Sequence, residues 1–282
     1  MSRIVYVNGE YLPEEEGKVS IFDRGFLFAD GVYEVSAVLR ARLVDNQAHL
    51  TRLHRSLSGL NIPQPVSDED IVAAQQELVR RNNLDEGMVY LQITRGPADR
   101  DFAYPEHPDP TLVMFTQDLA LIDSPAARRG LTIKTMEDIR WKRRDIKTVG
   151  LLASSMAKQA ALDAGADDAW LVEDGYVTEG TSNNAFILTQ AGVIRTRQLS
   201  NLILHGITRA AVLRLAGQEE LRIEETPFTP EEAYRAKEAF VTSATTFAMP
   251  VVKIDDRPIG DGQPGPVVRR LRELYIDRAL HA

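Results

Sequence analysis

Helical and strand-like segments are mixed along this chain without a strict alternation. Leucines recur every three or four residues over His49–Leu60, and Asp68–Asn83 repeats the pattern behind Ser67, a plausible N-cap, so both segments are predicted to be amphipathic helices. Strands are predicted around them, over Gly31–Leu39, Met88–Thr94 and Thr111–Thr116. Because the order is not a repeated strand–helix–strand, we expect an α+β fold rather than a doubly wound sheet.

A length of 282 residues suggests two domains. The turn-rich segment 119–130 is the predicted linker, between an N-terminal domain of residues 1–118 and a C-terminal domain of residues 131–282. A hairpin is predicted at Asn8-Gly9, because this pair suits a type I′ turn. The second part should contain strands over 131–136, 169–172, 176–179, 185–188, 193–196 and 239–242, and helices over 154–164, 208–216 and 267–279.

Composition excludes several classes of protein. The chain has no cysteine, which excludes a disulfide scaffold, a thiol nucleophile and a thiolate metal site, and its five histidines are scattered, so we expect no metal. A net charge of −8 argues against nucleic-acid and membrane partners. Met1–Lys18 lacks the apolar run of a signal peptide, and no stretch approaches the roughly 20 apolar residues of a membrane span, so we expect a soluble, cytoplasmic protein.

Lys147 is the first candidate for chemistry. It follows the basic turn Arg140–Arg144, with apolar Ile146 and Val149 nearby. Neighbouring cations and apolar side chains disfavour the ammonium form of a lysine and so lower its pKa. A lowered pKa is what an imine-forming lysine needs. Spacing alone leaves open a solvated lysine in a basic turn.

Three polar segments in the second part are further candidates. Thr178–Asn184 offers one carboxylate, Glu179, followed by a glycine and small polar residues, in a pattern that also fits a polar hairpin. Gly206 leads into a helix at Thr208, where free N–H groups and the Thr208 hydroxyl suit a phosphate, although an ordinary Gly-Thr helix cap is the alternative. Val241–Thr246 suits a phosphate or a turn. Together, an imine-capable lysine, a carboxylate for a ring nitrogen and two phosphate-binding turns are the components of a pyridoxal phosphate site.

These residues resemble the class IV (fold type IV) pyridoxal-phosphate aminotransferases over nearly the whole chain, and within that family the D-amino-acid transaminases most. The matching stretches are Asp23–Gly25, Gly31–Val35, His49–Leu53, Thr94–Gly96, Glu137–Trp141, Asp145–Lys147, Ala157–Gln159, Val177–Gly180, Gly206–Arg209 and Val241–Ser243. The resemblance implies a cofactor between two domains, and a homodimer whose subunits share each active site.

The resemblance also implies roles for particular residues. Lys147 would be the Schiff-base lysine and the acid–base group of the proton shift, and Glu179 would pair with the pyridine nitrogen. The phosphate would be held by Arg52, which a helical wheel places on the surface, and by two turns. The remaining cofactor-binding residues implied are Asn183 at the polar edge of the ring, Leu204 against its face, and Ile207, Thr208, Ala244 and Thr245 at the phosphate.

The substrate carboxylate would meet Tyr33 and Arg100. A bidentate arginine suits a carboxylate, although a mobile loop arginine is the alternative. Phe102 stands where the best-known D-amino-acid transaminases carry a histidine, so one partner of the carboxylate is missing.

The expected activity is transfer of an amino group between a D-amino acid and a 2-oxo acid by ping-pong half-reactions. Activities that use the same cofactor site remain alternatives: a branched-chain L-amino-acid transaminase, an R-selective amine transaminase or a 4-amino-4-deoxychorismate lyase. A binding protein that keeps the fold without catalysis is disfavoured, because Lys147 and Glu179 are both present.

Overall fold

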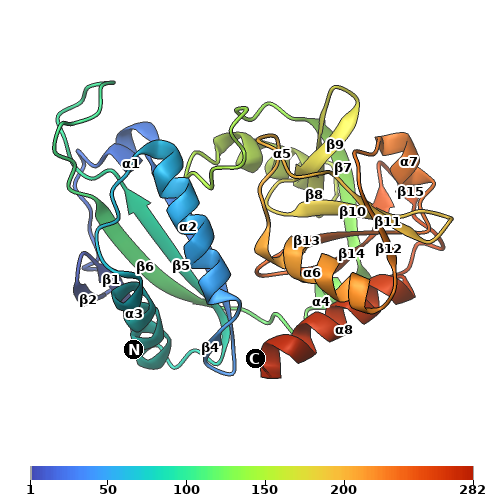
Figure 1. Cartoon of the computed structure of the whole chain (residues 1–282), viewed down its shortest axis with the longest axis horizontal. Helices are drawn as coiled ribbons and strands as arrows, with labels where there is room; N and C mark the ends of the chain where they lie inside the picture. Colours follow the sequence, from blue (N-terminus) through green and yellow to red (C-terminus); the bar gives the residue numbers. More distant parts are fainter. Residues whose placement is uncertain (1, 282) are drawn as a thin grey trace. The chain divides into compact units, whose positions relative to one another are not determined.

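The chain divides into two compact units in a computed structural model that describes residues 2–281 (Figure 1). The first unit contains the residues up to Ala120 together with Ile146–Gly150, and the second contains Leu121–Asp145 and the residues from Leu151 onward. The boundaries inferred from sequence assign Ile146–Gly150 to the C-terminal domain instead. The proposed linker 119–130 contains a short helix, α4 (Pro125–Arg129).

The first unit is built on an antiparallel sheet in the order β2-β1-β6-β5-β3-β4. Its strands are β1 (Ile4–Val7), β2 (Glu10–Pro13), β3 (Gly31–Leu39), β4 (Arg42–Leu43), β5 (Glu86–Thr94) and β6 (Thr111–Asp118). Asn8 and Gly9 both have positive φ, 46° and 99°, which confirms the predicted hairpin turn. The long strands β3, β5 and β6 confirm the three strands predicted here.

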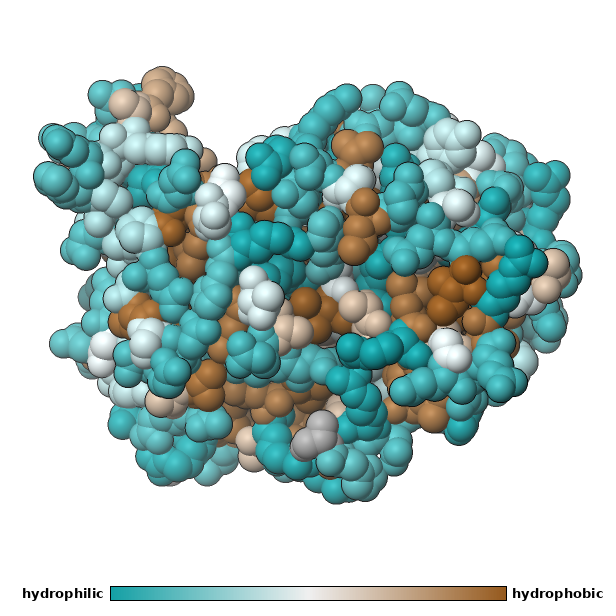
Figure 2. Space-filling view, viewed as in Figure 1, coloured by the Kyte–Doolittle hydropathy of each residue, from teal (hydrophilic) through white to brown (hydrophobic). Residues whose placement is uncertain are grey.

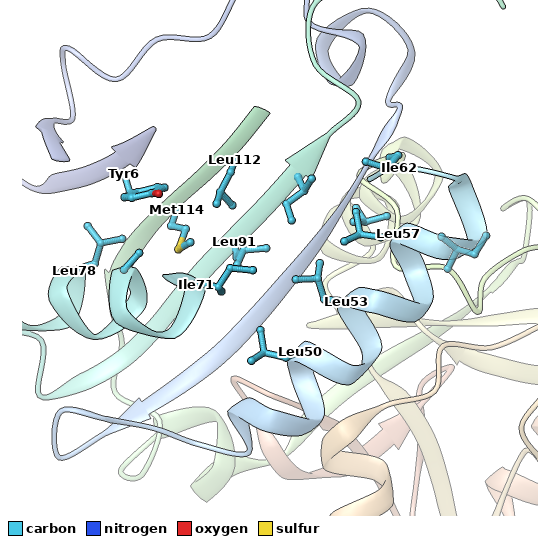
Figure 3. Packing of buried hydrophobic residues seen from close by; sticks show 14 residues of the cluster. Tyr6, Leu50, Leu53, Leu57, Ile62, Ile71, Leu78, Leu91, Leu112 and Met114 are labelled. Atoms are coloured by element: carbon cyan, nitrogen blue, oxygen red, sulfur yellow. The ribbon is translucent and has the colours of Figure 1, made fainter. Parts of the chain in front are cut away.

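Helices α2 (Asn46–Leu60) and α3 (Asp68–Arg81) supply one side of the core of the first unit, and both were predicted. The Ser67 side chain accepts from Asp70 N and so caps α3, as expected. Figure 3 shows the leucine stripe of α2 facing the apolar residues of the sheet. A short helix, α1 (Arg24–Phe28), is capped by the Asp23 side chain and was not predicted.

The second unit contains a larger mixed sheet, in the order β12-β11-β10-β13-β14-β7-β8-β9, with β15 paired to β14. Its strands are β7 (Leu131–Glu137), β8 (Asp168–Glu173), β9 (Tyr176–Gly180), β10 (Asn184–Leu188), β11 (Val193–Thr196), β12 (Arg222–Glu225), β13 (Glu238–Ser243), β14 (Phe247–Ile254) and β15 (Arg257–Pro258). The pairs β11–β12, β14–β7 and β7–β8 are parallel and the others antiparallel. Two sheets that mix with helices in this way confirm the α+β class.

Besides α4, the helices of the second unit are α5 (Leu152–Asp163), α6 (Ile207–Gln218), α7 (Pro230–Tyr234) and α8 (Pro266–His281). A separate apolar core is formed around Trp170, Phe228 and Val241. Hydrophilic residues cover most of the face shown in Figure 2, with apolar residues in smaller groups between them. Over residues 2–281, none of the helices combines the length and apolarity that crossing a bilayer demands.

Candidate active site

Lys147 lies in the short segment that returns to the first unit. Its N–H donates to Ser56 Oγ over 3.2 Å, and its carbonyl accepts from Tyr33 N over 3.0 Å. The Nζ atom lies 4.1 Å from the centre of the Tyr33 ring, within the range of a cation–π contact. The half-buried lysine is therefore held against β3, the strand that carries the predicted substrate residue Tyr33.

Arg52 is buried on α2, although the helical wheel predicts a surface position. Its Nε and Nη2 atoms donate to the two oxygens of Glu34 over 2.8 Å each, and His49 Nδ1 lies 2.8 Å from Glu34 Oε2. Burial alone would raise the pKa of Glu34, but Arg52 and His49 outweigh it and hold the pKa well below its ordinary value. This two-point pairing fixes the plane of the guanidinium group.

Glu179 lies at the end of β9 with a buried carboxylate that accepts three hydrogen bonds. Arg140 Nη1 donates to Oε1 over 2.7 Å, while Asn184 Nδ2 and Leu204 N each donate to Oε2 over 3.0 Å. Burial is the largest influence on the pKa of Glu179 and raises it despite the Arg140 charge and the Leu204 N–H. A carboxylate in this setting gains from a further cationic partner.

Arg140 is itself held by a second carboxylate. Its Nε and Nη2 atoms donate to the two oxygens of Asp138 over 2.9 Å and 2.7 Å, and Thr178 Oγ1 donates to Asp138 Oδ2 over 2.6 Å. Burial tends to raise the pKa of Asp138, yet the bond from Arg140 leads the opposing influences and the pKa is lowered. The guanidinium of Arg140 is thus fixed in the position from which it meets Glu179.

Asn183 and its neighbour Asn184 point to different partners. Asn183 Nδ2 donates to Asp168 Oδ2 over 2.8 Å. Asn184 begins β10 and donates to Glu179 and, over 2.9 Å, to the carbonyl of Leu204. Asn183 lies in the bend before β10 and Asn184 is the first residue of the strand, and only the Asn184 amide donates to the carboxylate.

The N-terminus of α6 lies beside Asn184. Gly206 precedes its first residue, Ile207, and no side chain caps the helix among the residues described, so its first N–H groups suit an anion. Thr208 is buried in the first turn. A Cβ at Gly206 would lie 2.1 Å from Asn184 Oδ1, so glycine is required here by space, since its φ of −65° is an ordinary value.

Ala244 and Thr245 lie in the half-buried turn between β13 and β14. Thr246 N donates to Ser243 Oγ over 3.2 Å, and the Ser243 and Thr246 hydroxyls lie 2.8 Å apart. The β13 residue Thr242 pairs in register with Asn184. The second unit therefore gathers Glu179, Leu204, the N-terminus of α6 and this turn around the first residue of β10.

Thr242 also presents a buried hydroxyl that has no hydrogen-bond partner within residues 2–281. Buried polar groups in folded proteins are nearly always bonded, to the protein itself, to water or to a ligand. An unbonded hydroxyl two residues before Ala244 marks this end of β13 as a place where a polar group belongs.

The two predicted substrate residues belong to the first unit and have different settings. Tyr33 stacks on Tyr90 with ring centres 5.5 Å apart. Arg100 is exposed, with its guanidinium carbon 5.5 Å from the Phe28 ring centre and 5.7 Å from that of Phe102. Phe102 is 81% exposed, and its ring is tilted by 56° from the Phe28 ring, with the ring centres 5.6 Å apart.

Sequence reasoning missed Arg140, Asn184 and Glu34 as supporting residues. Arg140 is one of several cations in a basic turn, and Glu34 is one residue of a β-branched strand. Asn184 carries the clearest signal, because it begins an apolar strand five residues after Glu179.

Comparison with known proteins gives consistent results. The model of the family described as amino-transferase class IV matches residues 31–254. The chain is 38% identical to the D-alanine aminotransferase of Bacillus licheniformis over 98% of its own length and 97% of the relative's. For the D-alanine aminotransferase of Staphylococcus aureus (strain MSSA476), identity is 35% over 96% of each chain.

A solved structure is similar in fold. The branched-chain amino acid aminotransferase of T.th., crystallised with pyridoxamine 5'-phosphate, superposes with a TM-score of 0.93 at 28% identity, over 99% of this chain and 94% of that one.

Proposed function

Because the chain belongs to class IV of the aminotransferases, which depend on pyridoxal phosphate, we propose that it transfers an amino group between a D-amino acid, such as D-alanine, and a 2-oxo acid, such as 2-oxoglutarate. In one half-reaction the enzyme takes the amino group and releases a 2-oxo acid, and in the other it gives the group to a second 2-oxo acid. The observation that carries the proposal is the similarity to D-alanine aminotransferases over nearly the full chain.

The donor set around Glu179 fits a pyridine nitrogen. A buried carboxylate with a raised pKa is stabilised by a protonated ring nitrogen, and Arg140 and Asn184 fix the direction in which it faces. Bound pyridoxal phosphate supplies an electron-withdrawing ring that stabilises negative charge on the substrate α-carbon. Lys147 Nζ would hold the cofactor aldehyde covalently, with loss of water, and would move a proton once released.

The remaining cofactor residues follow the same proposal. Arg52, fixed by Glu34, would meet the phosphate together with the N–H groups of Ile207 and Thr208. The turn that contains Ala244 and Thr245 would complete the phosphate site, Leu204 would press against the ring and Asn183 would lie towards its polar edge. The division into domains 1–118 and 131–282 stays part of this proposal.

Tyr33 and Arg100 would bind the substrate carboxylate. Arg100 is free to adjust because it is exposed and contacts only aromatic faces in the interactions described. With Phe102 in place of a histidine, carboxylate binding would depend more heavily on Arg100.

A branched-chain L-amino-acid transaminase is the second candidate, because the fold superposes closely on such an enzyme. The deciding assay compares D-alanine, L-leucine and an aromatic R-amine as donors to 2-oxoglutarate, with Lys147→Ala as the inactive control. Pyruvate formation from D-alanine is the expected result. Its absence alongside turnover of L-leucine would replace the first candidate by the second.

We also propose that the enzyme is a homodimer and works in the cytoplasm. Phe22, Phe26 and Phe102 are large apolar residues exposed on the first unit, and association of two copies would bury such surface. Light scattering after gel filtration tests the dimer, and cell fractionation tests the location.

A further inference from the structure

Arg272 makes an unusual set of contacts on α8, the helix drawn in red in Figure 1. Although it is an arginine it is buried, and its Nη1 atom donates to the carbonyls of Thr246, over 2.6 Å, and Ala248, over 3.2 Å. Its Nη2 atom donates to the carbonyls of Leu121 and Ile122. One guanidinium group thus binds four backbone carbonyls from two segments far apart in the sequence.

The residue between Thr246 and Ala248, Phe247 at the start of β14, has a constrained backbone. Phe247 has a φ of 56°, a left-handed conformation that bulky residues rarely adopt. Its ring is fully buried, 5.1 Å from the Tyr275 ring centre and 5.5 Å from the Arg272 guanidinium carbon. Such a conformation persists only where its surroundings enforce it, and here α8 supplies those surroundings.

The same residues define the end of the turn assigned to the phosphate. Ser243 ends β13, Phe247 begins β14, and the two are paired, so residues 244–246 form the connection between the strands. The Thr246 carbonyl, held by Arg272, belongs to the peptide that closes this connection. Movement of that peptide would displace Thr246 and, with it, the hydroxyl bond to Ser243.

We propose that Arg272 is a positioning residue for cofactor binding: through the Thr246 and Ala248 carbonyls it holds the 244–246 turn in the form that receives the cofactor phosphate. The inference rests on the proposed function, because it assigns the turn to a phosphate. Arg272 does not touch the ligand and acts only through the backbone. Its bonds to Leu121 and Ile122 anchor it at the residues where the second unit begins.

The experiment compares two ligands that differ only in the phosphate group. Apoenzymes of wild type, Arg272→Met and Arg272→Lys are titrated with pyridoxal phosphate and with pyridoxal, and tryptophan fluorescence gives the dissociation constants. The control is Arg269→Met, on the same helix, because Arg269 is exposed and its Nε donates only to Pro264 O in the bonds described.

We expect Arg272→Met to weaken pyridoxal phosphate binding about tenfold or more, the effect of losing charge-assisted hydrogen bonds, with pyridoxal binding nearly unchanged. Arg272→Lys keeps the charge without the planar fork, so it should show a smaller loss of the same kind. It also serves as the test if Arg272→Met does not fold. Arg269→Met should bind both ligands as wild type does.

Equal losses for both ligands would show a general effect on stability and would overturn the proposal, as would wild-type affinity in both variants. Failure of the wild-type apoenzyme to bind pyridoxal phosphate would instead refute the proposed function, and this role of Arg272 with it.

Discussion

Gly206→Ala should disturb the site through a single atom. The new Cβ would lie 2.1 Å from Asn184 Oδ1, closer than any such contact in real proteins, so the Asn184 amide must move. That amide donates to Glu179 and to the Leu204 carbonyl. Loss of one hydrogen bond to a charged group and one to a neutral group reduces stability by about 2–4 kcal/mol.

A smaller contribution comes from the helix itself. Alanine is a poorer N-cap than glycine by about 0.5–1 kcal/mol. We therefore expect Gly206→Ala to lower the free energy of unfolding by about 2.5–5 kcal/mol in total. In an Asn184→Ala background the obstructing amide is gone and only Arg209 Cβ stays close, at 3.1 Å, so the same substitution should cost little beyond the N-cap contribution.

Unfolding of the apoenzyme in guanidinium chloride, followed by tryptophan fluorescence, measures these differences. Both tryptophans, Trp141 and Trp170, belong to the second unit, so the signal reports on the unit that contains Gly206. Gly217→Ala is the matched control in the same helix, where a Cβ meets nothing within 4 Å, and it should stabilise by about 0.5–1 kcal/mol. An equal effect of Gly206→Ala in both backgrounds would refute the role assigned to Asn184.

Further predictions concern charged residues. Because the folded pKa of Glu179 is raised, this carboxyl favours the folded state below pH 4.5, and the contribution is lost as the pH rises from 4.5 through the folded pKa. The Glu179→Gln apoenzyme should therefore be at least as stable as wild type at pH 7 in thermal unfolding. Its turnover of D-alanine should nevertheless fall about a hundredfold or more, and unchanged turnover would argue against a ring-nitrogen partner. The effect of pH on Glu34 has the opposite sign, because its folded pKa lies below 4.5. The ionised carboxylate stabilises the fold above pH 4.5, and this contribution is lost as the pH falls from 4.5 through the folded pKa. Glu34→Gln should lower stability at pH 7 by about 3 kcal/mol, with a difference that shrinks in acid, as circular dichroism would measure. Arg100→Met should raise the KM for D-alanine about tenfold. The melting temperature should not change, because the side chain is exposed. An unchanged KM, or a lower melting temperature beside the raised KM, would contradict a direct role with substrate.

Local patterns were enough to predict most of the long elements of the fold. The leucine spacing predicted α2 and the Ser67 cap predicted the start of α3, because both signals depend on a few neighbouring residues. The strand β14 was missed, because Pro250 within it argues against a paired strand and only the neighbouring strands decide otherwise. Short helices such as α4 and α7 have too few residues to show a period.

In the candidate site, too, some residues could be predicted from the sequence and others depend on contacts with distant parts of the chain. Lys147 and Glu179 could be singled out from their chemistry, and the family resemblance supplied the residues around them. Burial of Arg52 was not predictable from the helical wheel, because it depends on Glu34, 18 positions earlier on a strand. The contacts of Lys147 with Ser56 and Tyr33 span about a third of the chain and leave no local signal.

The return of Ile146–Gly150 to the first unit has a consequence for how the protein can be made. The chain passes between the units after residues 120, 145 and 150, so no single cut yields two complete units. A fragment that ends at Ala120 would lack the strand-like segment that bonds to Gly31 and Tyr33. During synthesis on the ribosome, the first unit can close only after residue 150 has emerged, when 25 residues of the second unit, Leu121–Asp145, are already present. The segment that carries Lys147 is thus the last part of its own unit to arrive.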